Sequence, residues 1–252
     1  MISSTKKVTL NDIIGNHPLM QKQLAIAKKA ASCDAPVLLY GETGTGKELF
    51  ARAIHNLSSR KDSVFIGQNC SAIPANLFEG IFFGTEKGAY TGAVSSPGIF
   101  QQADGGTLLL DELNSMPLHL QSKLLRAIQE GCVRRVGGLS EQSVDTRIIT
   151  TINEDPELLV QQGYIRADLF YRLNVVRINI PPLRDHREDI PDYIDCFIRK
   201  SNLKHSRNVR GVSDSVMNEL MERDYPGNIR QLEHLIESSV VLCDGEIISE
   251  LI

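Results

Sequence analysis

The residues with the clearest chemical potential form a glycine-rich segment directly after the apolar run Val37–Tyr40. The segment reads Gly41, Glu42, Thr43, Gly44, Thr45, Gly46, Lys47 and Glu48. Its three glycines let the backbone curl so that successive N–H groups, together with the positive end of a following helix, face an anion. In loops of this kind the lysine reaches the β- and γ-oxygens of the ligand. The spacing therefore predicts a phosphate-binding loop for a nucleoside triphosphate.

A second apolar run, Leu108–Leu110, is followed by two acids, Asp111 and Glu112. If the run is a strand, the acids lie at its carboxyl end, where open α/β sheets bind ligands. We expect Asp111 to hold Mg²⁺, directly or through water, and Glu112 to orient and polarise a water that attacks ATP. Glu48 stands where the general motif has a hydroxyl for magnesium. The alternatives are a chance glycine turn and an acidic pair at a helix N-terminus.

Composition places the chain among soluble globular proteins. Its 252 residues are 42% hydrophobic, and the formal net charge of −4 with no extended basic patch predicts no direct DNA binding. The five cysteines are scattered and form no zinc-like pair, which suits reduced thiols in a cytosol. No signal peptide or apolar run of about 18 residues is present. We therefore expect a cytoplasmic protein without membrane contact.

Short apolar, β-rich runs alternate with helical patterns through most of the chain. Such alternation predicts a parallel sheet with helices on both faces, an α/β fold. Helical spacing is seen in His17–Cys33 and again after the glycine-rich segment. The expected strands are Val37–Tyr40, Val64–Ile66, Gly106–Leu110, Arg147–Thr151 and Val175–Ile180.

The Pro181-Pro182 pair ends this alternation. Three helical stretches follow, and Ser213 is placed to cap the second of them. We expect an α/β nucleotide-binding domain over residues 8–182 and a small helical domain over 183–252. The helical stretches are Glu188–Lys200, Ser213–Arg223 and Asn228–Leu242.

Taken together, these motifs resemble the central AAA+ ATPase domain of bacterial enhancer-binding proteins, which activate sigma-54 RNA polymerase. The resemblance runs from Ile13-Ile14-Gly15 to the final helix, and it includes Glu48, because the family usually reads Gly-Lys-Glu there. It implies an AAA+ P-loop NTPase with a helical lid, which hydrolyses ATP with Mg²⁺ as an oligomer, a hexameric ring. It also implies sigma-54 RNA polymerase as the partner.

The segment that carries most of this resemblance lies between the two phosphate motifs. It is similar to the family's G-A-F-T-G-A loop, which contacts sigma-54, with Tyr90 in place of phenylalanine. A glycine-rich segment on its own is usually a flexible turn, but this position favours the family loop. A second loop, Val136–Glu141, is expected beside it at the pore of the ring. The partner-binding residues implied are Gly88, Ala89, Tyr90, Thr91, Gly92 and Ala93.

Two asparagines are assigned through the same resemblance. Asn69 ends a segment similar to the family's second strand, where it pairs with the catalytic Glu112 and couples nucleotide state to the loop. The alternative is an asparagine that caps the next helix. Asn153 ends a sensor-like segment and is carried over as a nucleotide contact. Ile152 occupies the family's threonine position in that segment.

Three arginines complete the implied active site. Arg166 and Arg172, in the finger-like segment Ile165–Leu173, would act in trans on a neighbouring subunit's phosphoryl group. Six positions apart, they do not share a helical face, but both can border an interface if the helix starts between them. Surface ion pairs are the alternative. Arg230, in the lid-like segment Tyr225–Leu232, would contact nucleotide from its own subunit.

The sequence thus predicts the ATP-hydrolysing core of a sigma-54-dependent activator that remodels the closed promoter complex through the Gly88–Ala93 loop. Two alternatives stay open. One is a nucleotide-binding regulatory module that no longer activates sigma-54, suggested by Ile152 and Tyr90. The other is an AAA+ motor of another clade, such as a chelatase or helicase loader. No helix-turn-helix or receiver pattern is recognised, so we expect the catalytic part of a longer regulator.

Overall fold

The computed structural model describes residues 7–251, which divide into two compact units. The first unit contains Ile26–Tyr40 and Glu48–Asn179, with a short stretch that ends at Leu10. The second contains Asn11–Ala25, Gly41–Lys47 and the chain from Ile180 onward. The phosphate-binding segment is therefore grouped with the C-terminal helices. The sequence-based division at residue 182 stays a prediction.

A five-stranded parallel sheet forms the centre of the first unit, in the order β2-β3-β6-β1-β7. All five strands correspond to runs expected from the sequence, so the predicted parallel α/β architecture is confirmed. Crossovers of this kind need intervening helices, which explains the alternation along the chain. The strands are β1 Val37–Tyr40, β2 Phe65–Asn69, β3 Thr107–Asp111, β6 Arg147–Ile152 and β7 Val176–Asn179.

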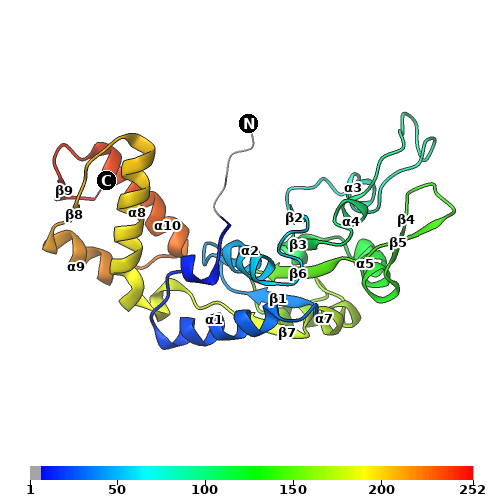
Figure 1. Cartoon of the computed structure of the whole chain (residues 1–252), viewed down its shortest axis with the longest axis horizontal. Helices are drawn as coiled ribbons and strands as arrows, with labels where there is room; N and C mark the ends of the chain where they lie inside the picture. The colour runs from blue at the N-terminus through cyan, green and yellow to red at the C-terminus, as the bar shows by residue number, and fades with distance from the viewer. Residues whose placement is uncertain (1–6, 252) are drawn as a thin grey trace. The chain divides into compact units, whose positions relative to one another are not determined.

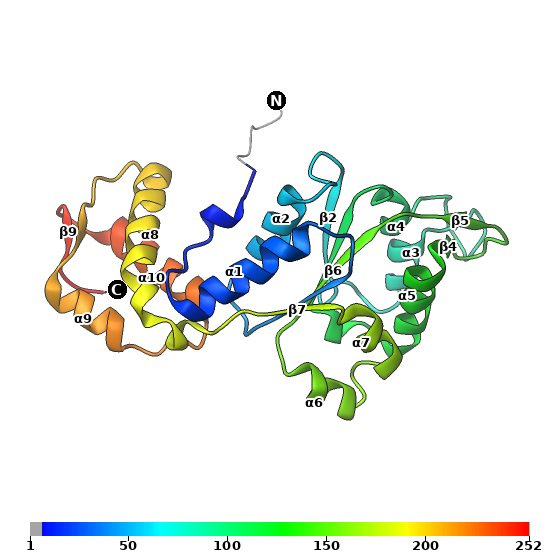
Figure 2. The same ribbon diagram turned by 60° about the horizontal axis from the view of Figure 1, so that its bottom comes forward.

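Helices cover both faces of this sheet (Figures 1 and 2). Leu108 and Leu110 join a buried cluster with side chains of α3 (Phe78–Phe83), α5 (Leu118–Glu130) and α7 (Ala167–Leu173). The alternate residue Thr107 faces the other way and bonds the His55 ring of α2 (Lys47–Leu57) over 2.9 Å. Because neighbouring strand residues point to opposite faces, burial on both sides explains the unbroken apolar strands.

Two loops project from the first unit beside one another (Figure 1). One joins α3 to the short helix α4 (Ile99–Gln102) and contains the Gly88–Ala93 segment. The other is the tip of an antiparallel hairpin, β4 (Cys132–Arg134) with β5 (Glu141–Ser143), where the sequence indicated only a loop. The remaining helices of this unit are η2 Leu113–Ser115 and α6 Pro156–Gln161.

The second unit is helical and has its own buried core, to which Leu220, Leu232 and Ile236 contribute. The predicted cap at Ser213 is confirmed, since its hydroxyl accepts a hydrogen bond from the Val216 amide. One parallel pair, β8 (Gly211–Val212) with β9 (Ile247–Ile248), was not expected, because two-residue strands carry no periodic signal. The helices are η3 Leu183–Asp185, η4 Arg187–Asp189, α8 Ile190–His205, α9 Asp214–Glu222 and α10 Asn228–Leu242.

Two further helices lie near the N-terminus. They are η1 Leu10–Asp12 and α1 Pro18–Ala31, and α1 begins among residues of the second unit and ends among those of the first. Within residues 7–251, no helix is both long and apolar enough to cross a membrane.

Candidate functional site

Glycine conformation shapes the phosphate-binding loop between β1 and α2. Gly44 and Gly46 have φ of 83° and 91°, in the region that favours glycine. A Cβ at Gly44 would also lie 2.1 Å from the carbonyl oxygen of Gly227, so a side chain has no room there. The Thr45 hydroxyl donates to the Glu42 carbonyl over 2.8 Å and closes the turn. The sequence prediction of a backbone that curls on its glycines agrees with this geometry.

Lys47 concentrates positive charge where the loop meets α2. Its ammonium is largely buried and donates to the carbonyls of Gly41 at 2.6 Å and Glu42 at 2.9 Å. Lys47 is also the first residue of an eleven-residue helix, whose free N–H groups add a positive end. Phosphate oxygens are charged acceptors and form stronger hydrogen bonds with such donors than neutral carbonyls do. The donor set therefore fits a nucleotide phosphate.

The two glutamates of the loop have different partners. Glu42 accepts hydrogen bonds from Arg184 at 2.9 Å and from Asn228 at 3.2 Å, and the Arg184 bond is the largest cause that lowers the pKa of Glu42. Glu48 lies in the first turn of α2 and pairs with Arg52 at 2.8 Å. Neither Arg184 nor Asn228 was expected from the sequence to be functional, although Asn228 stands in the lid-like segment Tyr225–Leu232.

The acid pair at the end of β3 is held by the neighbouring strands. Asp111 accepts a hydrogen bond from the Thr151 hydroxyl at 2.6 Å and from the Asn69 amide at 3.2 Å. The Thr151 oxygen also accepts from the Glu112 backbone N–H at 2.9 Å. Thr151 is fully buried and connects both acids, a role that was not expected from the sequence. The available signal was a threonine next to the carboxyl end of a fully buried strand.

Glu112 has a left-handed backbone, with φ of 55° and ψ of 53°. For a residue with a side chain this conformation costs about 1 to 3 kcal/mol and persists only where the surroundings impose it. Asn69 was predicted to pair with Glu112, but within the described residues its amide donates to Asp111 instead. The Asn69 oxygen accepts from the backbone N–H of Ser71 at 2.7 Å. Asn69 therefore joins the metal-binding candidate to the chain that leads toward α3.

The sensor-like segment ends beside another asparagine. The Asn153 oxygen accepts a hydrogen bond from Asn114 at 3.2 Å. Ile152 is only 1% exposed and belongs to the apolar cluster of the first unit. An isoleucine is therefore accommodated by its packing at the position where the family has threonine. The nucleotide contact assigned to Asn153 stays a prediction.

The finger-like arginines lie at opposite ends of α7. The helix begins at Ala167, between Arg166 and Arg172, as the finger hypothesis requires. Arg166 forms a two-pronged ion pair with Asp168, at 3.0 and 2.7 Å. Arg172 lies in the last turn and lines a cavity of about 300 Å³ in the first unit. In the second unit, the Arg230 backbone donates to the Gly44 carbonyl at 3.2 Å, and the roles proposed for the three arginines remain predictions.

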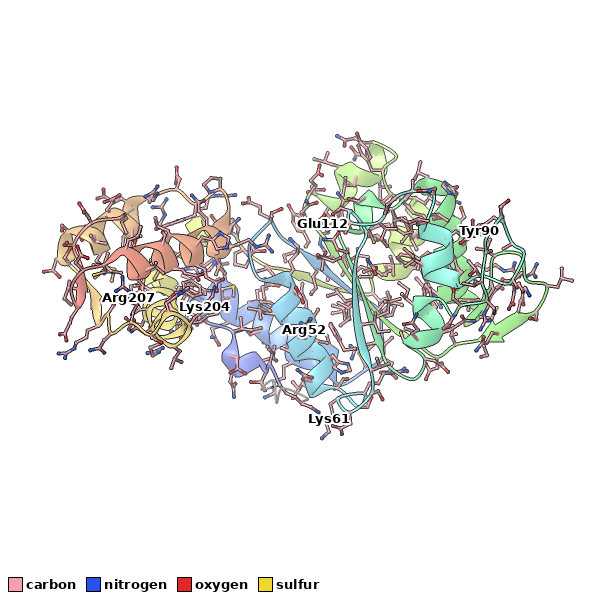
Figure 3. The ribbon with its side chains drawn as sticks, turned by 90° about the horizontal axis from the view of Figure 1, so that it is seen from above. Arg52, Lys61, Tyr90, Glu112, Lys204 and Arg207 are labelled. Carbon is pink, nitrogen blue, oxygen red and sulfur yellow. The ribbon has the colours of Figure 1, made fainter. Side chains whose placement is uncertain are left out.

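The Gly88–Ala93 segment forms an exposed tip on an anchored base. Tyr90 is 56% exposed, and Ala93 is buried. At the base, the Thr85 hydroxyl donates a hydrogen bond to the Val94 carbonyl at 2.7 Å. The Glu86 N–H donates to the carbonyl of Val136, in the tip of the β4–β5 hairpin. Figure 3 shows Tyr90 on this loop and Glu112 at the end of β3, on separate parts of the first unit. The tip can therefore contact a partner without belonging to the acid pair.

Comparison with known proteins agrees with this arrangement. The family model described as the sigma-54 interaction domain matches residues 13–179, and the AAA+ ATPase lid domain matches residues 184–251. The chain is 52% identical over 232 residues to the transcriptional activator RocR of Bacillus subtilis (strain 168), covering 92% of this chain and 50% of RocR. It is 47% identical to the transcriptional regulatory protein ZraR of Salmonella typhimurium, covering 94% and 54%.

A solved structure gives the same result for the fold. NtrX from Brucella abortus, crystallised in complex with ADP, has a TM-score of 0.88 and 33% sequence identity, covering 96% of this chain and 53% of NtrX. The fold and the site define a P-loop NTPase of the AAA+ class with a helical lid. The chain belongs to the sigma-54 interaction domain family. It spans about half the length of the curated relatives it matches.

Cys70 provides a chemical test of the acid pair's surroundings. Burial, then the charges of Asp111 and Glu112, raise the pKa of its thiol from 9.0 to about 12. At about pH 8 we expect N-ethylmaleimide to modify the exposed Cys33 and to leave Cys70 unmodified until guanidinium unfolds the protein. Peptide mass spectrometry reads both sites, and equal labelling of the two thiols in the native protein would contradict the buried site.

The same shift predicts the sign of a stability change. The folded pKa of Cys70 is raised, so its contribution is complete below pH 9.0 and decreases as pH rises toward about 12. A Cys70→Ala variant should lose this part of the pH dependence in chemical denaturation, although its overall stability also changes because a buried side chain becomes smaller.

Proposed function

We propose that this chain is the ATP-hydrolysing core of a sigma-54-dependent transcription activator, which remodels the closed complex through the Gly88–Ala93 loop. One observation carries the proposal: an exposed loop of the expected sequence is anchored on the unit that holds Asp111 and Glu112. Membership of the sigma-54 interaction domain family supports the partner. The proposal includes cytoplasmic location and no direct DNA contact by this chain.

ATP hydrolysis needs both a phosphate-binding loop and an acid pair, and each of these motifs follows a strand of the central sheet. In the sheet, β6 lies between β3 and β1, and all three strands are parallel, so the strand before the loop and the strand before the acids end at the same edge of the sheet. Lys47 and the loop N–H groups would hold the phosphates, and Glu112 would take part in deprotonating the attacking water. Asp111 would hold Mg²⁺, which when bound neutralises charge on the phosphates.

Asn69 offers a route from hydrolysis to the loop. It bonds Asp111 on one side and Ser71 on the other, and the chain from Ser71 leads through α3 to the loop. A change at the acid pair on hydrolysis can therefore alter the position of that segment. Movement of the exposed tip would then change its contact with sigma-54.

Arg166 and Arg172 would complete the site of a neighbouring subunit in a hexameric ring. A guanidinium supplied in trans stabilises charge on the transferring phosphoryl group, so turnover would depend on assembly. In the single chain Arg166 forms an exposed ion pair with Asp168. Assembly can break this pair at little cost, since exposed ion pairs contribute about 0 to 1 kcal/mol to stability.

The first test separates ATP binding from hydrolysis. Glu112→Gln should bind ATP normally but lower turnover at least about a hundredfold, because the water is no longer polarised. Lys47→Ala should weaken binding itself. Fluorescent-nucleotide titration and phosphate release measure the two steps, with Glu222→Gln, an exposed change on α9, as the control. Normal turnover in Glu112→Gln would refute the assignment.

The second test addresses arginine fingers in trans. Turnover per subunit should rise with protein concentration, and Arg172→Ala should abolish it with little change in ATP affinity. Mixed Arg172→Ala and Lys47→Ala subunits should regain part of the activity, because some interfaces then combine two intact halves. Pull-down with two different tags establishes co-assembly. Co-assembled mixtures as inactive as either parent would count against the proposal.

The third test distinguishes an activator from other ATPases. Thr91→Ala should keep hydrolysis within about fivefold of wild type but lose sigma-54 binding with a transition-state analogue, because one lost contact removes about 1 to 3 kcal/mol. Thr91→Ser, which keeps the hydroxyl, should bind better than Thr91→Ala. Leu203→Ala, on the exposed surface of α8, is the control.

Two outcomes would favour the alternatives. A wild-type chain that binds ATP tightly with almost no turnover would be a regulatory module. Active hydrolysis without any analogue-dependent binding to sigma-54 would indicate a motor of another clade. Parallel loss of hydrolysis in Thr91→Ala would show that the loop belongs to the fold instead of the partner surface.

A further inference from the structure

An acid in a phosphate-binding loop is an electrostatic problem. Glu42 lies within the loop whose N–H groups and Lys47 are suited to an anion. A carboxylate close to a polyphosphate repels it, and the repulsion grows as bound nucleotide displaces water from the site. The hydrogen bond from Arg184 lowers the pKa of Glu42 and so favours its charged form. A cationic partner that offsets the Glu42 charge would therefore favour nucleotide binding.

Arg184 meets this carboxylate with both ends of its guanidinium. One terminal nitrogen donates to Oε2 over 2.9 Å and the other donates to Oε1. A two-pronged arrangement fixes orientation as well as charge, and lysine cannot reproduce it. Both side chains are partly exposed, at 50% for Arg184 and 38% for Glu42. Exposed pairs contribute little to stability, about 0 to 1 kcal/mol, so the effect of this pair is best measured on anion binding and not on unfolding.

Asn228 connects the two partners from a buried position. Its amide donates to Glu42 at 3.2 Å and to the Thr43 carbonyl at 3.0 Å, and its oxygen accepts from the Leu183 N–H at 2.9 Å. Asn228 is fully buried and has φ of 52°, a conformation that needs support from its surroundings. Asn228 therefore holds Leu183, which precedes Arg184, and Thr43, which follows Glu42, through one side chain.

We propose that Arg184 is a positioning residue for nucleotide binding, which neutralises the Glu42 carboxylate in the phosphate loop while Asn228 holds the pair in register. The ligand class is a nucleoside polyphosphate with its magnesium. The inference rests on the nucleotide-binding part of the proposed function and does not involve sigma-54. A purely mechanical tie between the loop and the helices is the competing explanation.

Charge removal on both sides separates these explanations. Fluorescent ATP with Mg²⁺ is titrated into the full chain, and Arg184→Ala should raise Kd about tenfold, because Glu42 is then uncompensated. Glu42→Gln should bind ATP at least as tightly as wild type. The double variant should return to within about threefold of wild type. A mechanical tie predicts instead that the double variant is as defective as Arg184→Ala.

Two further variants control for the loss of any arginine in this unit and for the loss of the fork geometry. Arg187→Ala is the matched control, since Arg187 lies in the same unit but donates to Met221 at 2.7 Å and Asp224 at 2.9 Å. Arg184→Lys keeps the charge without the fork and should stay within about threefold of wild type. Thermal denaturation confirms folding, and if Arg184→Ala fails to fold, the Lys and double variants still decide between the explanations.

Salt dependence gives an independent measurement. The Arg184→Ala defect should shrink when KCl is raised from about 0.05 M to about 0.5 M, because screening weakens the Glu42 repulsion. Unchanged Kd in Arg184→Ala, a salt-independent defect, or no recovery in the double variant would each overturn the inference. A chain that binds ATP as described but never contacts sigma-54 would end the proposed function alone.

Discussion

The parallel pairing of β3, β6 and β1 is the constraint on which the candidate site depends. Because these strands run in the same direction, the loop after β1 and the acids after β3 start from one edge of the sheet. The central position of β6 then lets Thr151 reach Asp111 and the Glu112 backbone at once. An antiparallel arrangement would separate these chain ends. The apolar side chains that bury both faces of the sheet thus also hold the catalytic candidates in place.

Polar contacts then fix the position of each side chain at the end of β3. Thr151 and Asn69 both donate hydrogen bonds to the Asp111 oxygens and so fix the orientation of its side chain. The strained backbone of Glu112 is maintained by its neighbours, including the Thr151 bond. Strain of this kind is common at functional sites, where the surroundings compensate its cost. Asn69 extends the same network toward the projecting loop, as the proposed route from hydrolysis to the loop requires.

The phosphate loop shows how opposing charges are combined. Lys47 and the start of α2 favour an anion, whereas Glu42 opposes one. Arg184 and Asn228 give Glu42 a defined set of partners, so the acid can shape the loop without repelling its ligand. The helical unit that contains these two residues therefore contributes to the loop directly, whereas the nucleotide contact expected of Arg230 stays a prediction.

Local sequence was sufficient to determine the strands, most long helices and the Ser213 cap, because apolar runs, helical periodicity and capping residues act over a few positions. It also determined the family, since the phosphate loop, the acid pair and the Gly88–Ala93 segment are contiguous motifs. The β4–β5 hairpin and the β8–β9 pair were not predicted, because strands of only two or three residues show no periodic pattern. The partners of Asn69, Thr151 and Glu42 depend on contacts between distant parts of the chain. Only the tertiary structure decided that Asn69 bonds Asp111, and that Arg184 meets Glu42 across 142 positions.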